Sequence, residues 1–400
     1  ELYDGETYDA TAEEKLVGNA SVEKKPTATK PIPQVGEYVR EHERVAPVEL
    51  IVTPKGERVI DFGQNLAGYV EIRIKGKKGS RIVLSHAEVL DSEGNFYTGN
   101  YRSAKNRIEY VLSGGEDVFK PHFCFQGYRY IRLDEFPTEE VDLGCFTSVA
   151  IYSDMKRTGH FACGDNRINQ LYSNILWGQR SNFVDVPTDC PQRDERQGWM
   201  NDATVRFEAT PYNFDIGKMF PKIVRDLMDM QTAEGAIGCT APFIFGGIPA
   251  DPVCSSFLVA GYESMMHKGN RKVIADAFAA YEAWEACLLK NSTDHIVNYS
   301  YYGDWAAPAY ACQSEEFAVS AVTPGILMST GYYYFNSRLL AQIAGLLGKP
   351  ERAEAFRREA EGIREAFLKK WWNAETGCVG TGSQGCQAFA LWLDILPEEG

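Results

Sequence analysis

The feature that most constrains the fold of this chain is a change in hydrophobic periodicity near residue 157. Before it, apolar and polar residues alternate, as in the segment 70–74, which is typical of a β-strand with one buried face. After it, apolar residues recur at helical spacing, as Phe356, Ala360 and Ile363 do. A length of 400 residues also exceeds one ordinary core. The sequence therefore predicts a β domain followed by a helical domain.

The β domain is predicted over residues 46–152. Short alternating segments are separated by turn sequences such as KGKKGS, DSEGN and SGGED, a spacing typical of a β-sandwich. Residues 1–45 are polar and contain prolines, so they are predicted to be an extended segment or the end of an upstream β domain.

The helical domain is predicted over residues 157–400. Phe220, Val224, Leu227 and Gln231 share one helical face. Gly348 and Pro350 suit the end of one helix and the start of the next. Long loops rich in glycine, proline and aromatic residues lie at 235–252 and 298–310, and the aromatic run at 332–335 fits helical core better than a ligand platform. Such loops are usually functional, so they are expected to build a site at one end of the domain.

Charge and hydropathy exclude several functions. The formal net charge of −14 disfavours nucleic acid and favours a neutral substrate. No run of about 18 apolar residues exists, so no membrane span is expected. The first residues, ELYDGETYDA, lack the pattern of a signal peptide, and without a methionine Glu1 is not expected to be the natural start.

The ten cysteines form neither a CxxC pair nor a zinc pattern. They predict buried, reduced thiols and favour a cytoplasmic location. An extracytoplasmic location stays open, because a targeting segment upstream of Glu1 would be absent from this sequence. No cofactor or metal motif is present, and neither is expected.

The densest cluster of charged residues lies between residues 185 and 202. Pro187 and Pro191 exclude a continuous helix through its first half. Asn201 or Asp202 is predicted to cap the helix that follows. On spacing alone, salt bridges and a capping carboxylate explain the cluster better than catalysis does. The charged and aromatic residues concerned are Asp185, Asp189, Arg193, Asp194, Glu195, Arg196, Trp199 and Asp202.

Interleaved apolar residues favour a catalytic interpretation of the same cluster. Cysteine, proline and Trp199 within it indicate partial burial, and carboxylates that crowd together raise the pKa of at least one of them. An indole beside carboxylates also suits the apolar face of a sugar ring. Glycoside hydrolysis needs a protonated carboxylic acid and a second carboxylate, which this chemistry fits.

The segment VPTDCPQRDERQGWMNDA (186–203) resembles the signature of the bacterial α-L-rhamnosidases of glycoside hydrolase family seventy-eight. The segments DFGQNLAGYVEIRI (61–74), FQGYRYIRL (125–133) and YYGDW (301–305) are similar to the same family. The resemblance implies a multidomain α and β protein, in which an antiparallel β-sandwich precedes an (α/α)6-barrel catalytic domain that is incomplete at the C-terminus.

The resemblance also implies hydrolysis of terminal α-L-rhamnose with inversion. Glu195 matches the general acid. The family's general base is a glutamate, which is expected beyond residue 400, since Glu315 and Glu316 do not fit its motif. The expected partner is a rhamnosylated small molecule or oligosaccharide, and a homodimer is possible. The residues matched to substrate binding are Asp189, Arg193, Trp199, Asp202, Asp304 and Trp305.

Two departures from the family pattern leave alternatives open. Cys254 and Ser255 stand where the family has a tryptophan, and Asn201 stands where the signature commonly has glycine. The first departure would remove a pocket wall and shift the preference for sugar or aglycone. A glycosidase for another sugar on the same scaffold, or a catalytically silent carbohydrate-binding protein, are the alternatives.

Overall fold

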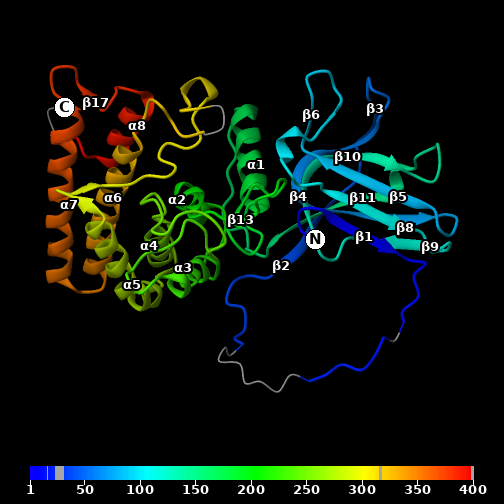
Figure 1. Cartoon of the computed structure of the whole chain (residues 1–400), viewed down its shortest axis with the longest axis horizontal. Helices are drawn as coiled ribbons and strands as arrows, with labels where there is room; N and C mark the ends of the chain where they lie inside the picture. The colour runs from blue at the N-terminus through cyan, green and yellow to red at the C-terminus, as the bar shows by residue number, and fades with distance from the viewer. Residues whose placement is uncertain (16, 23–30, 315–317, 398–400) are drawn as a thin grey trace. The chain divides into compact units, whose positions relative to one another are not determined.

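The computed structural model describes residues 1–15, 17–22, 31–314 and 318–397 (Figure 1). The chain forms two compact units. The sandwich unit comprises residues 1–154 and 160–196, and the helical unit comprises residues 155–159 and 197–400. The segment 160–196 therefore belongs with the strands, while the domain boundary at 152–157 stays a prediction. Glu315 and Glu316 lie outside the described residues.

Among the described residues, a nine-stranded sheet dominates the sandwich unit, in the order β1-β8-β5-β10-β4-β11-β2 with β3 and β9 also paired to β4. Its neighbours are antiparallel except for the parallel pair β1 and β8. The strands β1 and β2 lie within residues 1–45, the segment predicted to be extended or to be the end of an upstream β domain. The sheet strands are β1 (Gly5–Asp9), β2 (Val39–Val45), β3 (Glu49–Val52), β4 (Arg58–Lys75), β5 (Arg81–Ala87), β8 (Arg107–Val111), β9 (Glu116–Phe119), β10 (Gln126–Glu135) and β11 (Phe146–Ser153).

Strand β4 joins the two layers of the curled sheet. Its residues 58–61 pair with β3 and β10, whereas its residues 68–75 pair with β11 and β9. The predicted alternation is confirmed, because Val70 and Ile72 are buried in the core, with Ile74 packed at its margin. The smaller elements of the unit are β6 (Val89–Leu90), β7 (Phe96–Tyr97), η1 (Gly99–Tyr101), η2 (Leu143–Cys145) and β12 (Thr188–Asp189).

Helix α1 (Asn166–Ser181) covers part of the sandwich. The carboxylate of Asp165 caps it by accepting the backbone N–H of Arg167. At its other end, the Ser181 hydroxyl accepts the N–H of Ala67 in β4, at 3.1 Å. These contacts explain why the first helix of the chain clusters with the strands.

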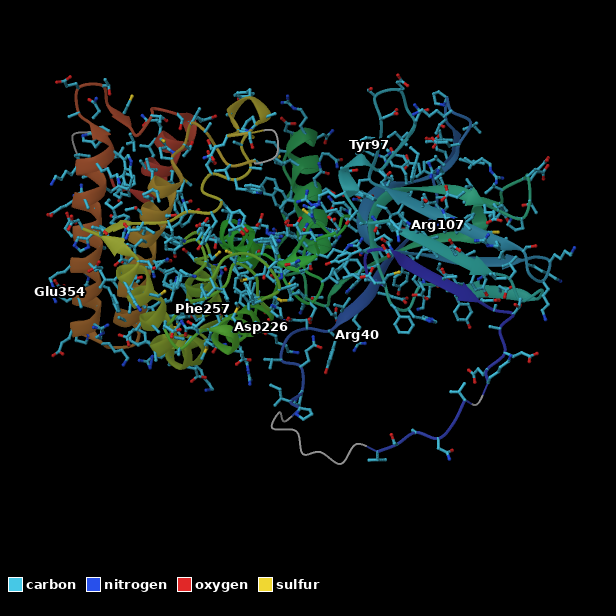
Figure 2. The ribbon with its side chains drawn as sticks, in the orientation of Figure 1. Arg40, Tyr97, Arg107, Asp226, Phe257 and Glu354 are labelled. Atoms are coloured by element: carbon cyan, nitrogen blue, oxygen red, sulfur yellow. The ribbon has the colours of Figure 1, made fainter. Side chains whose placement is uncertain are left out.

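The helical unit alternates two sets of helices. Helices α2, α4, α6 and α8 contact one another in succession, and α3, α5 and α7 pack outside them. Figure 2 labels Phe257, a buried residue of α4, and Glu354, an exposed residue of α7. The helices are α2 (Met200–Phe207), α3 (Met219–Met230), α4 (Ser256–Lys268), α5 (Arg271–Lys290), α6 (Gly325–Leu346), α7 (Pro350–Trp371) and α8 (Gln384–Leu393). Short elements connect them: β13 (Gln197–Gly198), η3 (Thr210–Tyr212), β14 (Ser292–Thr293), β15 (Ile296–Val297), η4 (Ala309–Ala311), β16 (Trp372–Asn373) and β17 (Cys378–Val379).

The helical patterns of the sequence are confirmed. In α3, Phe220, Val224 and Leu227 are buried, and Gln231 follows as the C-cap residue. In α7, the predicted apolar stripe is buried and Pro350 is the first residue. Gly348 adopts φ 74° after the C-cap of α6, a left-handed conformation that glycine adopts without strain.

All ten cysteines are free thiols, and they are not uniformly buried, because Cys163 is exposed. Among the described residues, no helix has both the length and the apolar character that a membrane crossing requires.

The core of the helical unit contains a buried acid, Glu285, that should make its stability depend on pH. Glu285 in α5 accepts a hydrogen bond from Ser337 of α6, while its Oε2 atom has no partner among the described residues. Burial raises the pKa of Glu285 from 4.5 to about 8. Because the folded chain holds this proton more tightly than the unfolded chain, protonation of Glu285 stabilises the fold. This contribution is complete below pH 4.5 and disappears as the pH rises through about 8.

We therefore expect Glu285→Gln to make the chain more stable than the wild type above pH 8, by roughly 3–5 kcal/mol at most. Thermal unfolding of both proteins between pH 5 and pH 9 measures the effect. The exposed Glu375 provides a matched control, because Glu375→Gln should leave the pH profile unchanged. Parallel profiles for wild type and Glu285→Gln would contradict the prediction.

Candidate active site

The acidic loop, residues 185–202, carries most of the predicted site. It contains no helix before Met200, which confirms the effect expected of its prolines. Three residues other than glycine adopt positive φ angles, namely Asp185 (68°), Cys190 (52°) and Arg196 (58°). Each costs about 1–3 kcal/mol, so contacts around the loop must hold it in this conformation.

Arg196 fastens the loop to the sandwich unit. Its guanidinium group is buried, and Nη1 donates to the carbonyl oxygens of Leu2 and Phe125, both at 2.6 Å. Nη2 donates to Oδ1 of Asn106 at 2.5 Å, and Nε donates to the carbonyl of Arg193 at 3.1 Å. Burial lowers the pKa of Arg196 to about 10. This side chain therefore fixes the loop immediately after Glu195.

Glu195 lies beside two guanidinium groups. Arg193 donates to Oε2 from Nε at 2.8 Å, and Arg102 donates to the same oxygen from Nη2 at 3.1 Å. The backbone carbonyl of Glu195 accepts the Tyr3 hydroxyl at 2.7 Å, and its side chain is only 12% exposed. The carboxylate is therefore held from the loop and from the β7–β8 connection, and the Glu195 backbone is held by Tyr3.

Asp194 has a different environment from its neighbour. It accepts hydrogen bonds from Nε of Arg102, at 2.5 Å, and from the backbone and hydroxyl of Ser103. Burial alone would raise the pKa of Asp194, but the bonds from Ser103 and Arg102 hold it below its usual range. The salt-bridge interpretation of the acidic cluster therefore fits Asp194.

Asp189 and Cys190 lie next to Glu195. One carboxylate oxygen of each acid and the sulfur of Cys190 are within 4.8 Å of one another. Burial, together with the charge of Asp189, raises the pKa of the Cys190 thiol. A metal would need the thiolate, and Oε2 of Glu195 already accepts two guanidinium groups. The three residues therefore do not fit a metal centre.

In the helical unit, the predicted aromatic walls are linked through a tyrosine. The Trp199 ring meets the Tyr302 ring edge-on at 5.5 Å between centroids, and Tyr302 meets Trp305 in the same way at 5.6 Å. Trp199 is buried, whereas Trp305 is 47% exposed. Trp305 is therefore the indole in this cluster that presents an open face.

Asp251 holds the loop that carries Asp304 and Trp305. It is buried, and its two carboxylate oxygens accept the backbone N–H groups of Tyr301, at 2.8 Å, and Tyr302, at 2.7 Å. Burial raises the pKa of Asp251 although these N–H groups oppose the shift. No sequence pattern singles out this aspartate, which is an isolated acid without periodic neighbours.

The predicted helix cap is wrong. Trp199 is the N-cap residue of α2, without a side-chain hydrogen bond, and Asp202 lies within the first turn. The N–H of Met200 is instead satisfied by the carbonyl of Cys239, at 2.9 Å. Asp202 still suits the helix N-terminus, where the macrodipole favours a carboxylate.

The structure brings the predicted residues together in two groups. Asp189, Arg193 and Glu195 lie together in the sandwich unit. Trp199 and Trp305 share a ring cluster in the helical unit, which also carries Asp202 on α2 and Asp304 in the loop before Trp305. Cys254 and Ser255, at the departure from the family pattern, are fully buried.

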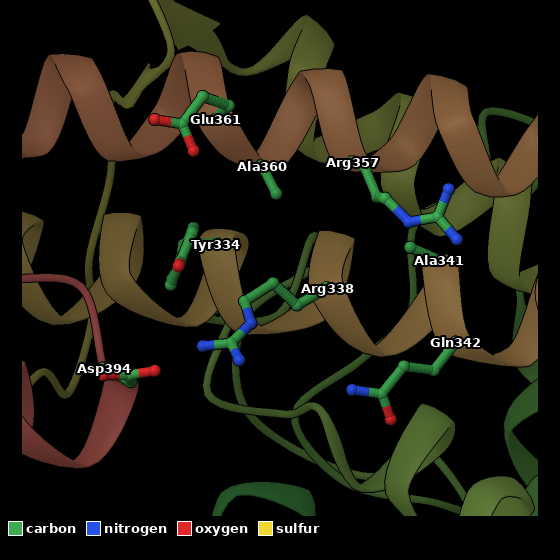
Figure 3. Close-up of a pocket in the computed structure, with 8 residues that line it drawn as sticks. All are labelled: Tyr334, Arg338, Ala341, Gln342, Arg357, Ala360, Glu361 and Asp394. Carbon is green, nitrogen blue, oxygen red and sulfur yellow. The ribbon is translucent and has the colours of Figure 1, made fainter.

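A cavity of about 430 Å³ lies between α6 and α7, beside the residue that ends α8 (Figure 3). It contains none of the residues predicted for the site. Its Arg338 donates to the carbonyl of Leu393 at 2.7 Å, and its Arg357 donates to Glu354 at 3.0 Å. These guanidinium groups already have protein partners. The lining residues are Tyr334, Arg338, Ala341, Gln342, Arg357, Ala360, Glu361 and Asp394.

Two family models match the chain. The model described as the bacterial alpha-L-rhamnosidase 6 hairpin glycosidase domain matches residues 156–400. The model described as the bacterial alpha-L-rhamnosidase concanavalin-like domain matches residues 51–152. Together they confirm the family resemblance of the acidic loop.

Individual relatives agree with the family models. An alpha-L-rhamnosidase of Streptomyces avermitilis is 32% identical over 359 residues, which cover 88% of this chain and 33% of that protein. An alpha-L-rhamnosidase of Formosa agariphila is 28% identical and matches all of this chain and 44% of its own length. The chain thus spans a third to less than half of the length of these relatives.

Solved structures confirm the predicted fold of a β-sandwich followed by an (α/α)6-type helical domain. The alpha-L-rhamnosidase from Dictyoglumus thermophilum has a TM-score of 0.89 at 28% identity. The alignment covers all of this chain and 46% of the length of that protein. The Streptomyces avermitilis enzyme complexed with L-rhamnose has a TM-score of 0.84 at 31% identity. The alignment covers all of this chain and 38% of the length of that protein.

Proposed function

Because the chain belongs to the bacterial α-L-rhamnosidase family, we propose that it acts in the hydrolytic release of terminal α-L-rhamnose, with inversion of configuration. The proposal assigns Glu195 as the general acid. The observation that carries this assignment is the environment of its side chain, which is 12% exposed and accepts guanidinium bonds from the described residues at Oε2 alone.

The chemistry of proton donation explains the arrangement of the two arginines. A proton carried on Oε1 passes to the glycosidic oxygen as an oxocarbenium-like transition state develops. Glu195 becomes negatively charged in this step, and Arg193 and Arg102 already donate to its other oxygen. Preorganised donors of this kind stabilise charge where it develops. They also keep the carboxyl group in one orientation, so that Oε1 faces the substrate.

The remaining predicted residues bind the sugar in this proposal. Asp189 and Asp202 accept hydrogen bonds from rhamnose hydroxyls, and Trp305, beside Asp304, presents its open indole face to the ring. Inversion requires a second carboxylate about 6.5–9.5 Å from the acid, with a water molecule between them. We assign this base to a glutamate after residue 400, because no segment of this sequence matches the family's base motif.

A panel of nitrophenyl glycosides tests the proposal with the full-length protein. We expect hydrolysis of the α-L-rhamnoside and not of the corresponding glucoside, arabinoside or mannoside. Proton NMR of the first product should show β-L-rhamnose before mutarotation. Turnover of another glycoside with none of the rhamnoside would contradict the sugar assignment. Early α-L-rhamnose would contradict inversion, and rhamnose binding without any turnover would favour the carbohydrate-binding alternative.

A further inference from the structure

A second cavity, of about 400 Å³, lies within the sandwich unit. This volume falls within the range of about 300–1,000 Å³ that small-molecule sites occupy. Its walls come from β4, the turn after β5, the start of β10, α1 and the acidic loop. The lining residues are Gln64, Asn65, Leu66, Glu88, Gly127, Asn174, Trp177, Gly178, Ser181, Asn182, Asp189, Cys190, Pro191 and Gln192.

The side chains of this cavity suit a neutral ligand rich in hydroxyl groups. The polar ones are two carboxylic acids, a serine and several carboxamides, and neither lysine nor arginine is among its lining residues. Carboxylates accept hydrogen bonds from hydroxyl groups, and carboxamides both donate and accept them. The single aromatic ring, Trp177, has the guanidinium group of Arg180 over it at 5.0 Å. Among the lining residues, a flat aromatic ligand would therefore have only this one ring to stack against.

Glu88 is held in place at the wall of the cavity. Asn65 donates to its Oε1 at 3.0 Å, and Asn100 donates to its Oε2 at 3.3 Å. Each carboxylate oxygen accepts up to two hydrogen bonds, so each has capacity for a ligand hydroxyl. Glu88 is partly buried, and this burial raises its pKa.

The cavity adjoins the proposed proton donor. Asp189 lines it, and the carboxylate of Asp189 lies within 4.8 Å of the Glu195 carboxylate. Gly127 of β10 permits this arrangement, because a Cβ atom there would lie 2.8 Å from the backbone nitrogen of Gln192. A general acid protonates the oxygen of the leaving group, so a cavity beside the acid is placed to hold the leaving group.

We propose that this cavity is the binding site for the leaving sugar, a neutral hexose unit to which the terminal rhamnose is linked. Glu88 and Asn65 recognise its hydroxyl groups. The inference rests on the proposed function and narrows the substrate class to rhamnosyl oligosaccharides, rather than rhamnosides of flat aromatic aglycones.

The test compares two leaving groups in the full-length protein. One substrate is the rhamnosyl hexose that the wild type hydrolyses best among the 1→2, 1→4 and 1→6 linkages, and the other is 4-nitrophenyl α-L-rhamnoside. Glu88→Ala should lower kcat/KM for the disaccharide about 10-fold or more relative to its effect on the nitrophenyl substrate. Glu116→Ala, an exposed acid of β9, is the matched control and should change neither value. Equal losses on both substrates would overturn the proposal.

A binding measurement separates failure of this inference from failure of the proposed function. Calorimetry on the Glu195→Gln variant should show that the intact disaccharide binds at least 10-fold more tightly than L-rhamnose, and that adding Glu88→Ala removes the difference. Equal affinities for disaccharide and rhamnose would overturn the leaving-sugar site. A wild-type protein that fails to hydrolyse every rhamnoside would instead contradict the proposed function.

Discussion

Glu195→Gln is expected to lower kcat for rhamnosyl disaccharides by about 10²–10⁴-fold, the usual effect of losing a general acid. The amide has the shape of the carboxyl group and still accepts hydrogen bonds from Arg193 and Arg102, but it has no proton to donate. The loss should shrink for 2,4-dinitrophenyl α-L-rhamnoside, because this leaving group departs without protonation. Steady-state kinetics with both substrates measure the difference.

Asp194→Asn is the matched control for this experiment. Asp194 occupies the same loop but bonds to Arg102 and Ser103, so its replacement should affect stability more than turnover. Thermal unfolding of Glu195→Gln should remain close to the wild type. Near-normal hydrolysis of the disaccharide by Glu195→Gln would show that another residue donates the proton, and an equal loss with both leaving groups would indicate a positioning role.

Arg196→Met should reduce the free energy of unfolding of the sandwich unit by about 3–5 kcal/mol, because hydrogen bonds from a charged donor contribute about 1.5–3 kcal/mol each and several are lost. The methionine would fill part of the space but would remove the Arg196 donor from the partly buried carbonyl groups of Leu2 and Phe125. For a unit of this size, the thermal midpoint should fall by about 10 °C.

Arg73→Met provides the comparison, because Arg73 is exposed on the same unit and its loss should change stability by less than about 0.5 kcal/mol. Chemical denaturation followed by circular dichroism measures both variants. An Arg196 variant as stable as the Arg73 variant would mean that the acidic loop is held by other contacts.

The parts of the fold that the sequence predicted are those whose periodicity reports burial directly. The stripe of α7 and the buried face of α3 could be predicted because helix geometry repeats within the segment itself. The cap of α2 could not. Its first N–H is satisfied by the carbonyl of Cys239, a residue from another loop, and the sequence near Trp199 does not reveal this contact.

The same reasoning separates the predicted site residues from those that the sequence did not indicate. Asp189, Arg193 and Glu195 lie in one continuous motif, and the structure places them together. Arg102 and Glu88 are contributed by segments about a hundred residues earlier, in the β-sandwich. Only the folded chain brings them to the acidic loop.

The attachment of the acidic loop to the sandwich unit has a consequence for domain exchange. A fragment that begins at residue 156, where the helical family model starts, would still encode Glu195. It would lack Tyr3 and Arg102, two of the groups that orient this residue. Chimaeras that shuffle helical domains among relatives should therefore inherit the acid together with its own N-terminal sandwich, and the natural crossover point lies after residue 196.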